Sequence, residues 1–148
     1  MKKVIISASL TGVLARREQC PYIPYTPEEI AEEGRRAVEA GASILHIHAR
    51  NDDGSPAYDV ETYARIMEEV KKRTPDAIIN FSTGAIHISR EERIAHITAL
   101  KPDMAALNMG SMNYGIYSSK AKKFYHDFIF ENSFTDIQFY LEKMNEAG

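Results

Sequence analysis

The chain has 148 residues, of which 44% are hydrophobic and 26% charged, and its formal net charge is -3. This length suits one domain with its own core, and the composition is that of an ordinary globular protein. No basic stripe is visible, which argues against nucleic acid as a partner. No segment approaches the ~20 apolar residues of a membrane span. The single cysteine, Cys20, is compatible with the reducing cytoplasm.

Strands and helices are predicted to alternate from the N-terminus. A β-branched run over 4–9 predicts the first strand. The segment 26–29 reads Thr-Pro-Glu-Glu, which combines a capping residue, proline at the first helical position and a capping-box glutamate. The helix that begins there is expected to stop at Gly41, and the apolar run 43–48 predicts the second strand.

The same order continues through the middle of the chain. A helix capped by Asp59 is expected to end at Pro75, and a helix with a capping box over 89–92 is expected to end before Pro102. The third and fourth strands are predicted over 77–81 and 104–107.

A last helix is predicted to begin at Ser133. Its expected inner side consists of Phe134, Ile137, Tyr140, Leu141 and Met144. The apolar patch 128–130 before it is interpreted as a packed loop within a long connection over 108–132.

Four consecutive βα units predict an α/β fold with a parallel sheet and right-handed crossovers. A (β/α)8 barrel needs eight such units and about 250 residues. We therefore interpret residues 1–148 as a single domain that forms the N-terminal half of a TIM barrel, four of whose eight units are present. The connections after the strands are the longer ones, as is typical of the functional face of such folds.

His46 and His48 end the second predicted strand. Residues two apart on a strand share a face, so these side chains project together, about 6.6 Å apart along the strand. Two imidazoles so placed are candidate ligands of one metal ion such as zinc. A pair of histidines that simply hydrogen-bond at a strand end is the alternative. His87, His96 and His126 do not obviously supply a third ligand.

Polar residues also follow the third and fourth strands. Ser82, Thr83 and Gly84 combine two hydroxyls with backbone N–H groups near a helix start, which suits an anion. An ordinary turn explains the same residues. Asn108 follows the fourth strand in a glycine-containing turn. The carboxyl ends of parallel strands meet at one edge of the sheet, so these groups are expected at a common site.

Taken in order, these residues resemble the β-keto acid cleavage enzymes, whose type activity is 3-keto-5-aminohexanoate cleavage. The resemblance is carried by the segments 10–12, 24–30, 40–50, 82–84, 100–104 and 107–115. It implies a zinc-dependent TIM barrel that forms a homo-oligomer. It also implies a retro-Claisen-type exchange, in which a β-keto acid and acetyl-CoA give acetoacetate and a new CoA thioester.

The resemblance assigns roles to particular residues. It implies that His46 and His48 bind zinc, that Ser82, Thr83 and Gly84 hold the substrate carboxylate, and that Asn108 lines the pocket. The family's third zinc ligand, a glutamate, and its Arg/Asp pair for carbon–carbon bond cleavage are expected in a C-terminal half that this chain lacks.

Two positions depart from the family pattern. Leu14 stands where members often carry an acid, and Ala106 where many carry a hydroxyl, which suggests a different or less polar β-keto acid as substrate. Two alternatives stay open. One is a non-catalytic half-barrel that binds a metal ion or an anion and assembles with itself. The other is a metal-dependent aldolase or hydrolase of similar architecture.

Overall fold

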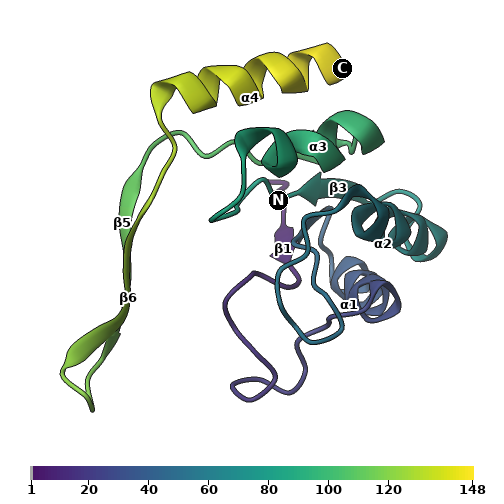
Figure 1. The fold of residues 1–148 in the computed structure, drawn as a ribbon. Coiled ribbons are helices and arrows are strands. Elements are labelled where there is room, and N and C mark those ends of the chain that lie inside the picture. The colour runs from purple at the N-terminus through teal and green to yellow at the C-terminus, as the bar shows by residue number, and fades with distance from the viewer. Residues whose placement is uncertain (1) are drawn as a thin grey trace.

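The computed structural model describes residues 2–148, and of His126 the backbone alone. A four-stranded parallel sheet has the order β1-β2-β3-β4. The strands are β1 (Ser7–Ser9), β2 (Ile44–Ile47), β3 (Ile78–Phe81) and β4 (Met104–Ala105). The helices between them are α1 (Pro27–Glu39), α2 (Val60–Arg73) and α3 (Arg90–Leu100). The predicted alternation of parallel strands and helices is confirmed (Figure 1).

The helices begin where their capping residues predict. Thr26 and Ser89 each accept a hydrogen bond from the N–H three residues later, and the glutamate there accepts one from the cap N–H. Asp59 caps α2 through a 2.7 Å bond from the N–H of Thr62. These contacts are local, and for that reason the sequence alone locates them.

The strands are shorter than predicted. β1 begins at Ser7 rather than at residue 4, and the side chains of Val4 and Ile5 are 77% and 79% exposed. In the described part of the chain, β1 lies at the edge of the sheet and pairs with β2, which begins at Ile44, opposite Ser7. The residues before Ser7 therefore extend beyond the start of the neighbouring strand.

The two faces of the sheet differ in burial. Leu45, Ile47, Ile79 and Phe81 are fully buried among the apolar stripes of the helices. The alternate residues of β2 and β3 face the other side and are partly or largely exposed. His46 lies on that second face, so the functional side chains stand on the side that the helices leave open.

The prediction of a packed loop at 128–130, within a long connection over 108–132, is wrong. Most of this connection forms a β-hairpin. β5 (Met112–Ser118) pairs antiparallel with β6 (Lys123–Phe130). Cross-strand aromatic pairs stabilise the hairpin, as Tyr114 contacts Phe128 and Tyr117 contacts Phe124. Figure 1 shows the hairpin as an arm that extends away from the four-stranded sheet.

The last helix, α4 (Phe134–Ala147), begins at its predicted cap, Ser133. Ile137 and Tyr140 are buried, as expected, but Phe134 is 91% exposed and Leu141 is also exposed. The prediction that they belong to the core is wrong. α4 lies along α3 as an outer layer, so only a narrow stripe of its surface finds a partner (Figure 1).

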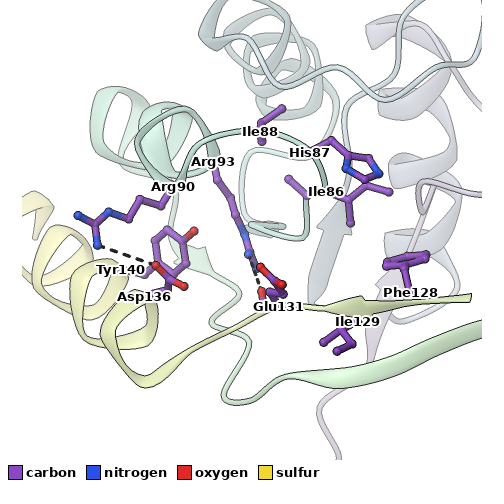
Figure 2. A pocket seen from close by; sticks show the side chains of 11 residues that line it. Ile86, His87, Ile88, Arg90, Arg93, Phe128, Ile129, Glu131, Asp136 and Tyr140 are labelled. Carbon is purple, nitrogen blue, oxygen red and sulfur yellow. Dashed lines mark hydrogen bonds and ion pairs between the residues drawn. The ribbon is translucent and has the colours of Figure 1, made fainter.

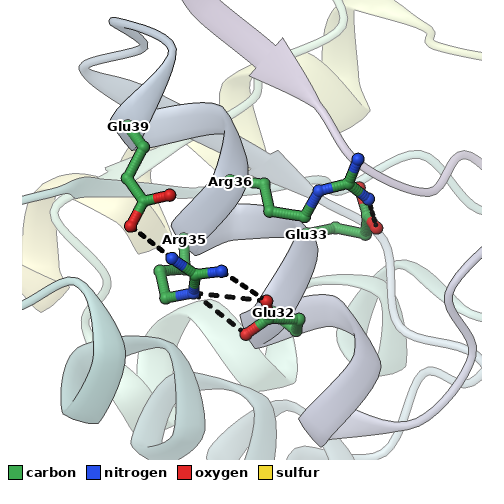
Figure 3. A network of polar contacts seen from close by, with 5 residues as sticks. All are labelled: Glu32, Glu33, Arg35, Arg36 and Glu39. Atoms are coloured by element: carbon green, nitrogen blue, oxygen red, sulfur yellow. Dashed lines mark hydrogen bonds and ion pairs between the residues drawn. The ribbon is translucent and has the colours of Figure 1, made fainter.

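The outer face of α1 carries charged side chains that pair along the helix (Figure 3). Arg35 contacts Glu32 and Glu39, and Arg36 contacts Glu33. Exposed pairs of this kind add little to stability, and they mark a solvated surface. Within residues 2–148, no helix is both long and apolar enough to cross a membrane.

Candidate metal and substrate site

The residues predicted after different strands meet at one cavity of about 260 Å³ at the carboxyl ends of the sheet strands. Its polar lining is His46, His48, Ser82, Gly84 and Asn108. Its remaining lining is apolar or aromatic and consists of Val13, Leu14, Tyr58, Ala85, Ile86, Ala106, Tyr114, Phe128 and Phe130. The fold therefore joins the ends of β2, β3 and β4 in one site.

The two histidines approach each other through their outer nitrogens. The Nε2 atoms of His46 and His48 are 3.3 Å apart, and the ring planes make an angle of 79°. Two nitrogen ligands of one tetrahedral zinc ion, each at roughly 2.0–2.1 Å, stand about 3.3 Å apart. The same separation also suits a weak N–H···N contact between neutral rings. The geometry thus fits a metal ion and does not require one.

Both imidazoles are held in the neutral form. Burial lowers the pKa of His46, and burial together with the nearby His46 and Arg50 lowers the pKa of His48 to about 4. A neutral ring offers a lone pair, which a protonated ring does not. At neutral pH both side chains are therefore ready to act as ligands.

Two neighbours position the pair. Thr11 Oγ1 donates to the carbonyl of His48 at 2.8 Å and accepts from its N–H at 2.9 Å. Asn80 lies opposite His46 in the β2–β3 register. Its Oδ1 is buried and makes no hydrogen bond of good geometry among the described residues, but the side chain is close enough to raise the pKa of His46 against the larger effect of burial. Metal-bound histidines usually direct their second ring nitrogen to such an acceptor. A buried acceptor beside His46 is thus compatible with a metal at the histidines.

The loop after β3 packs directly on His48. A Cβ on Gly84 would be in ordinary contact with His48 Cε1 at 3.5 Å and would crowd Ser82 Oγ at 3.2 Å, so the loop lies next to His48. Ser82 Oγ accepts from the Gly84 N–H at 3.0 Å, which leaves its own proton free to donate. Thr83 does not line the cavity, because its hydroxyl donates to the carbonyl of Ala106 at 2.6 Å.

Arg50 follows the histidines in sequence, but its side chain has a structural role. It is 2% exposed and donates to the carbonyls of Gly12, Gly54 and Ala15 at 2.7, 2.5 and 2.9 Å. These bonds fix the loops after β1 and β2 to each other. The loops that border the histidine pair therefore stand in a set position.

The hairpin's contribution to the cavity was not predicted. Tyr114, Phe128 and Phe130 line it from β5 and β6. The run of aromatic and β-branched residues around 123–130 is a strand signal that could have revealed the hairpin, but not its position over the site. No group of three or more His, Cys, Asp or Glu side chains suited to a metal occurs among the residues that the structure describes.

A larger cavity of about 440 Å³ adjoins the first (Figure 2). Ala85, Ile86 and Phe128 line both cavities. The larger one lies between the start of α3, α4 and the base of the hairpin, and its Arg93 is engaged by Thr83, Glu131 and Asn132. The histidine pair is not part of it, so we assign the chemistry to the smaller cavity.

The BKACE family model, described as beta-keto acid cleavage enzyme, matches residues 3–148. The chain belongs to this family. It is 43% identical over 116 residues to the 3-keto-5-aminohexanoate cleavage enzyme of Acetoanaerobium sticklandii, covering 78% of this chain and 42% of that enzyme. It is 34% identical to the 3,5-dioxohexanoate:acetyl-CoA acetone transferase of Paraburkholderia graminis, covering 99% of this chain and 52% of that protein.

Solved structures of ObcA share the fold of this BKACE chain. The ternary complex of ObcA with a C4-CoA adduct and oxalate aligns with a TM-score of 0.65 and 27% identity, over 86% of this chain and 30% of that one. The predicted fold class is confirmed: the four units are those of a TIM-barrel fold. The chain spans about half the length of the curated relatives it matches.

Proposed function

We propose that this chain provides the zinc-binding and carboxylate-binding part of a β-keto acid cleavage enzyme. The enzyme would exchange a β-keto acid with acetyl-CoA, giving acetoacetate and a new CoA thioester. The observation that carries the proposal is the 3.3 Å approach of the neutral His46 and His48 Nε2 atoms inside a substrate-sized cavity. Family membership and the acetyl-CoA-dependent activities in the relatives' names support the reaction class.

Each residue has a defined task in this proposal. His46 and His48 would hold zinc, which when bound polarises a keto oxygen as a Lewis acid. The free proton of Ser82 would donate to the substrate carboxylate, and the N–H of Gly84 keeps that hydroxyl oriented. The Asn108 amide would donate from the β4 side of the cavity. Thr83 would hold this loop in place, since its hydroxyl donates to the carbonyl of Ala106 and its own carbonyl accepts from Arg93.

The proposal extends beyond the residues of this chain. The third zinc ligand and the groups that cleave the carbon–carbon bond would come from the part of the relatives that the chain does not span. We also propose a homo-oligomer in the cytoplasm, where the single exposed Cys20 would stay reduced.

The metal site is tested by elemental analysis of the purified chain after loading with zinc and gel filtration. We expect near-stoichiometric zinc in the unaltered chain and its loss in a His46→Ala/His48→Ala double variant. His87→Ala is the matched control, because His87 lies in a neighbouring loop and lines only the larger cavity. Equal zinc in the double variant and the control would refute the site.

The reaction is tested by following acetoacetate and the new CoA thioester by mass spectrometry. The chain is assayed alone and with the C-terminal half of a curated relative supplied separately, each with and without acetyl-CoA. Product that requires both acetyl-CoA and the two histidines supports the exchange. Acetyl-CoA-independent cleavage would indicate an aldolase or hydrolase instead. Zinc binding without turnover in any mixture would indicate a non-catalytic half-barrel.

A further inference from the structure

We propose that the inner face of the β5–β6 hairpin is a specificity wall that selects β-keto acids with a neutral, apolar side chain. The wall consists of Tyr114, Phe128 and Phe130. This inference rests on the proposed function, because it places the substrate's keto acid end at the histidines and its side chain against the hairpin.

The lining of the cavity carries the first part of the argument. None of the described residues that line it is Asp, Glu, Lys or Arg. The polar groups gather at the histidines, Ser82 and Asn108, and the rest of the surface is aliphatic or aromatic. On the side of the cavity that this chain forms, a substrate whose carboxylate is bound at the polar end would therefore place its other end against apolar atoms.

The hairpin presents these aromatic side chains as a continuous surface. Tyr114 and Phe128 are directly paired across β5 and β6, and their rings stack with centroids 5.3 Å apart and planes 30° apart. Phe130 lies two residues from Phe128 and so shares its face. Ile129 points from the opposite side of β6 and is 59% exposed (Figure 2). The inner face is thus partly buried while the outer face meets solvent.

The base of the hairpin is fixed to the loop that carries Ser82. The buried Arg93 of α3 donates to the carbonyl of Thr83 and to Asn132 Oδ1, the latter at 2.6 Å. The backbone N–H of Asn132 in turn donates to Ser111 Oγ at 2.8 Å, and its Nδ2 donates to the carbonyl of Gly110. Arg93 therefore sets the distance between the wall and the carboxylate-binding loop.

This arrangement has a definite consequence for selectivity. Each methylene that leaves water for the wall should strengthen binding about fourfold. A terminal carboxylate or ammonium group would lose its water there without gaining an oppositely charged partner. The site should thus bind β-keto acids with longer neutral side chains more tightly than those with charged side chains of equal length.

The test measures dissociation constants by NMR titration of the zinc-loaded chain with four ligands. They are 3-oxobutanoate, 3-oxohexanoate, 3-oxohexanedioate and 4-trimethylammonio-3-oxobutanoate. We expect 3-oxohexanoate to bind about fifteenfold more tightly than 3-oxobutanoate, which has two fewer methylenes, and at least tenfold more tightly than the dianion or the cationic ligand. Tightest binding of the cationic ligand would show that the aromatic rings act as a cation cage and would overturn the proposal.

Phe128→Ala and Phe124→Ala form a matched pair on the same strand, since Phe124 lies outside the cavity. Phe128→Ala should remove most of the advantage of 3-oxohexanoate over 3-oxobutanoate, and Phe124→Ala should keep it. Equal effects of the two variants would overturn the wall. If the wall is overturned but the unaltered chain still binds zinc through the two histidines, the proposed function stands. If the unaltered chain binds neither zinc nor any of the four ligands, the proposed function and the specificity wall are both refuted.

Discussion

Arg93 is the side chain whose removal should disturb the site most from a distance. The residue is 6% exposed, and its guanidinium donates to the carbonyl of Thr83, to Asn132 Oδ1 at 2.6 Å and to the carbonyl of Glu131 at 3.4 Å. The Arg93→Met variant keeps much of the apolar stem but leaves two buried acceptors without a donor. Charged hydrogen bonds and unsatisfied buried acceptors of this kind are each worth ~1–3 kcal/mol, so we expect a loss of about 3–5 kcal/mol.

The assay is urea unfolding followed by circular dichroism, with Arg90→Met as the matched control. Arg90 lies one turn earlier on α3, its side chain is 41% exposed, and it contacts Glu91. Figure 2 shows its second contact, with Asp136. Its replacement should leave the free energy of unfolding close to that of the unaltered chain. The Arg93→Lys variant, which has fewer donors, should fall between the two. If Arg93→Met and Arg90→Met unfold at the same urea concentration, the anchoring role is refuted.

Three further variants test particular contacts. Burial lowers the pKa of His96 to about 4 from an unfolded value near 6.5, so unfolding takes up a proton between these pH values. His96 should therefore lower the free energy of unfolding by about 3 kcal/mol as the pH drops from 6.5 to 4, and His48, whose pKa is also about 4, should add to this fall. His96→Gln should remove the His96 share of the slope in unfolding titrations, and an unchanged slope would contradict this. Gly54→Ala should lower the free energy of unfolding by more than ~1 kcal/mol, because the φ of Gly54 is +80° and a Cβ there would lie 2.4 Å from the Tyr25 ring. Gly110→Ala is the control, and it should leave the free energy of unfolding nearly unchanged because the space around Gly110 is open. Thr11→Val should weaken zinc binding about tenfold by releasing the backbone of His48, as measured by competition with a chelator; unchanged affinity would remove Thr11 from the positioning role.

Much of the fold could be predicted because its signals are local. The caps at Thr26, Asp59, Ser89 and Ser133 each depend on a hydrogen bond to a residue three positions later, so a short segment contains all the information. The alternation of apolar runs with amphipathic helices likewise indicated parallel βα units. The pairing of His46 with His48 on one face follows from the two-residue period of a strand.

The walls of the site were decided only by the tertiary structure. Arg50 and Arg93 find acceptors 35 to 39 residues away along the chain for four of their bonds, and no local pattern specifies those partners. The hydroxyl of Thr83 likewise donates to the carbonyl of Ala106, 23 residues away along the chain. The sequence determines which groups can bond and at which ends of the strands they stand. Packing between remote segments determines which of those groups remain free, and it was packing that brought an aromatic hairpin against the two histidines.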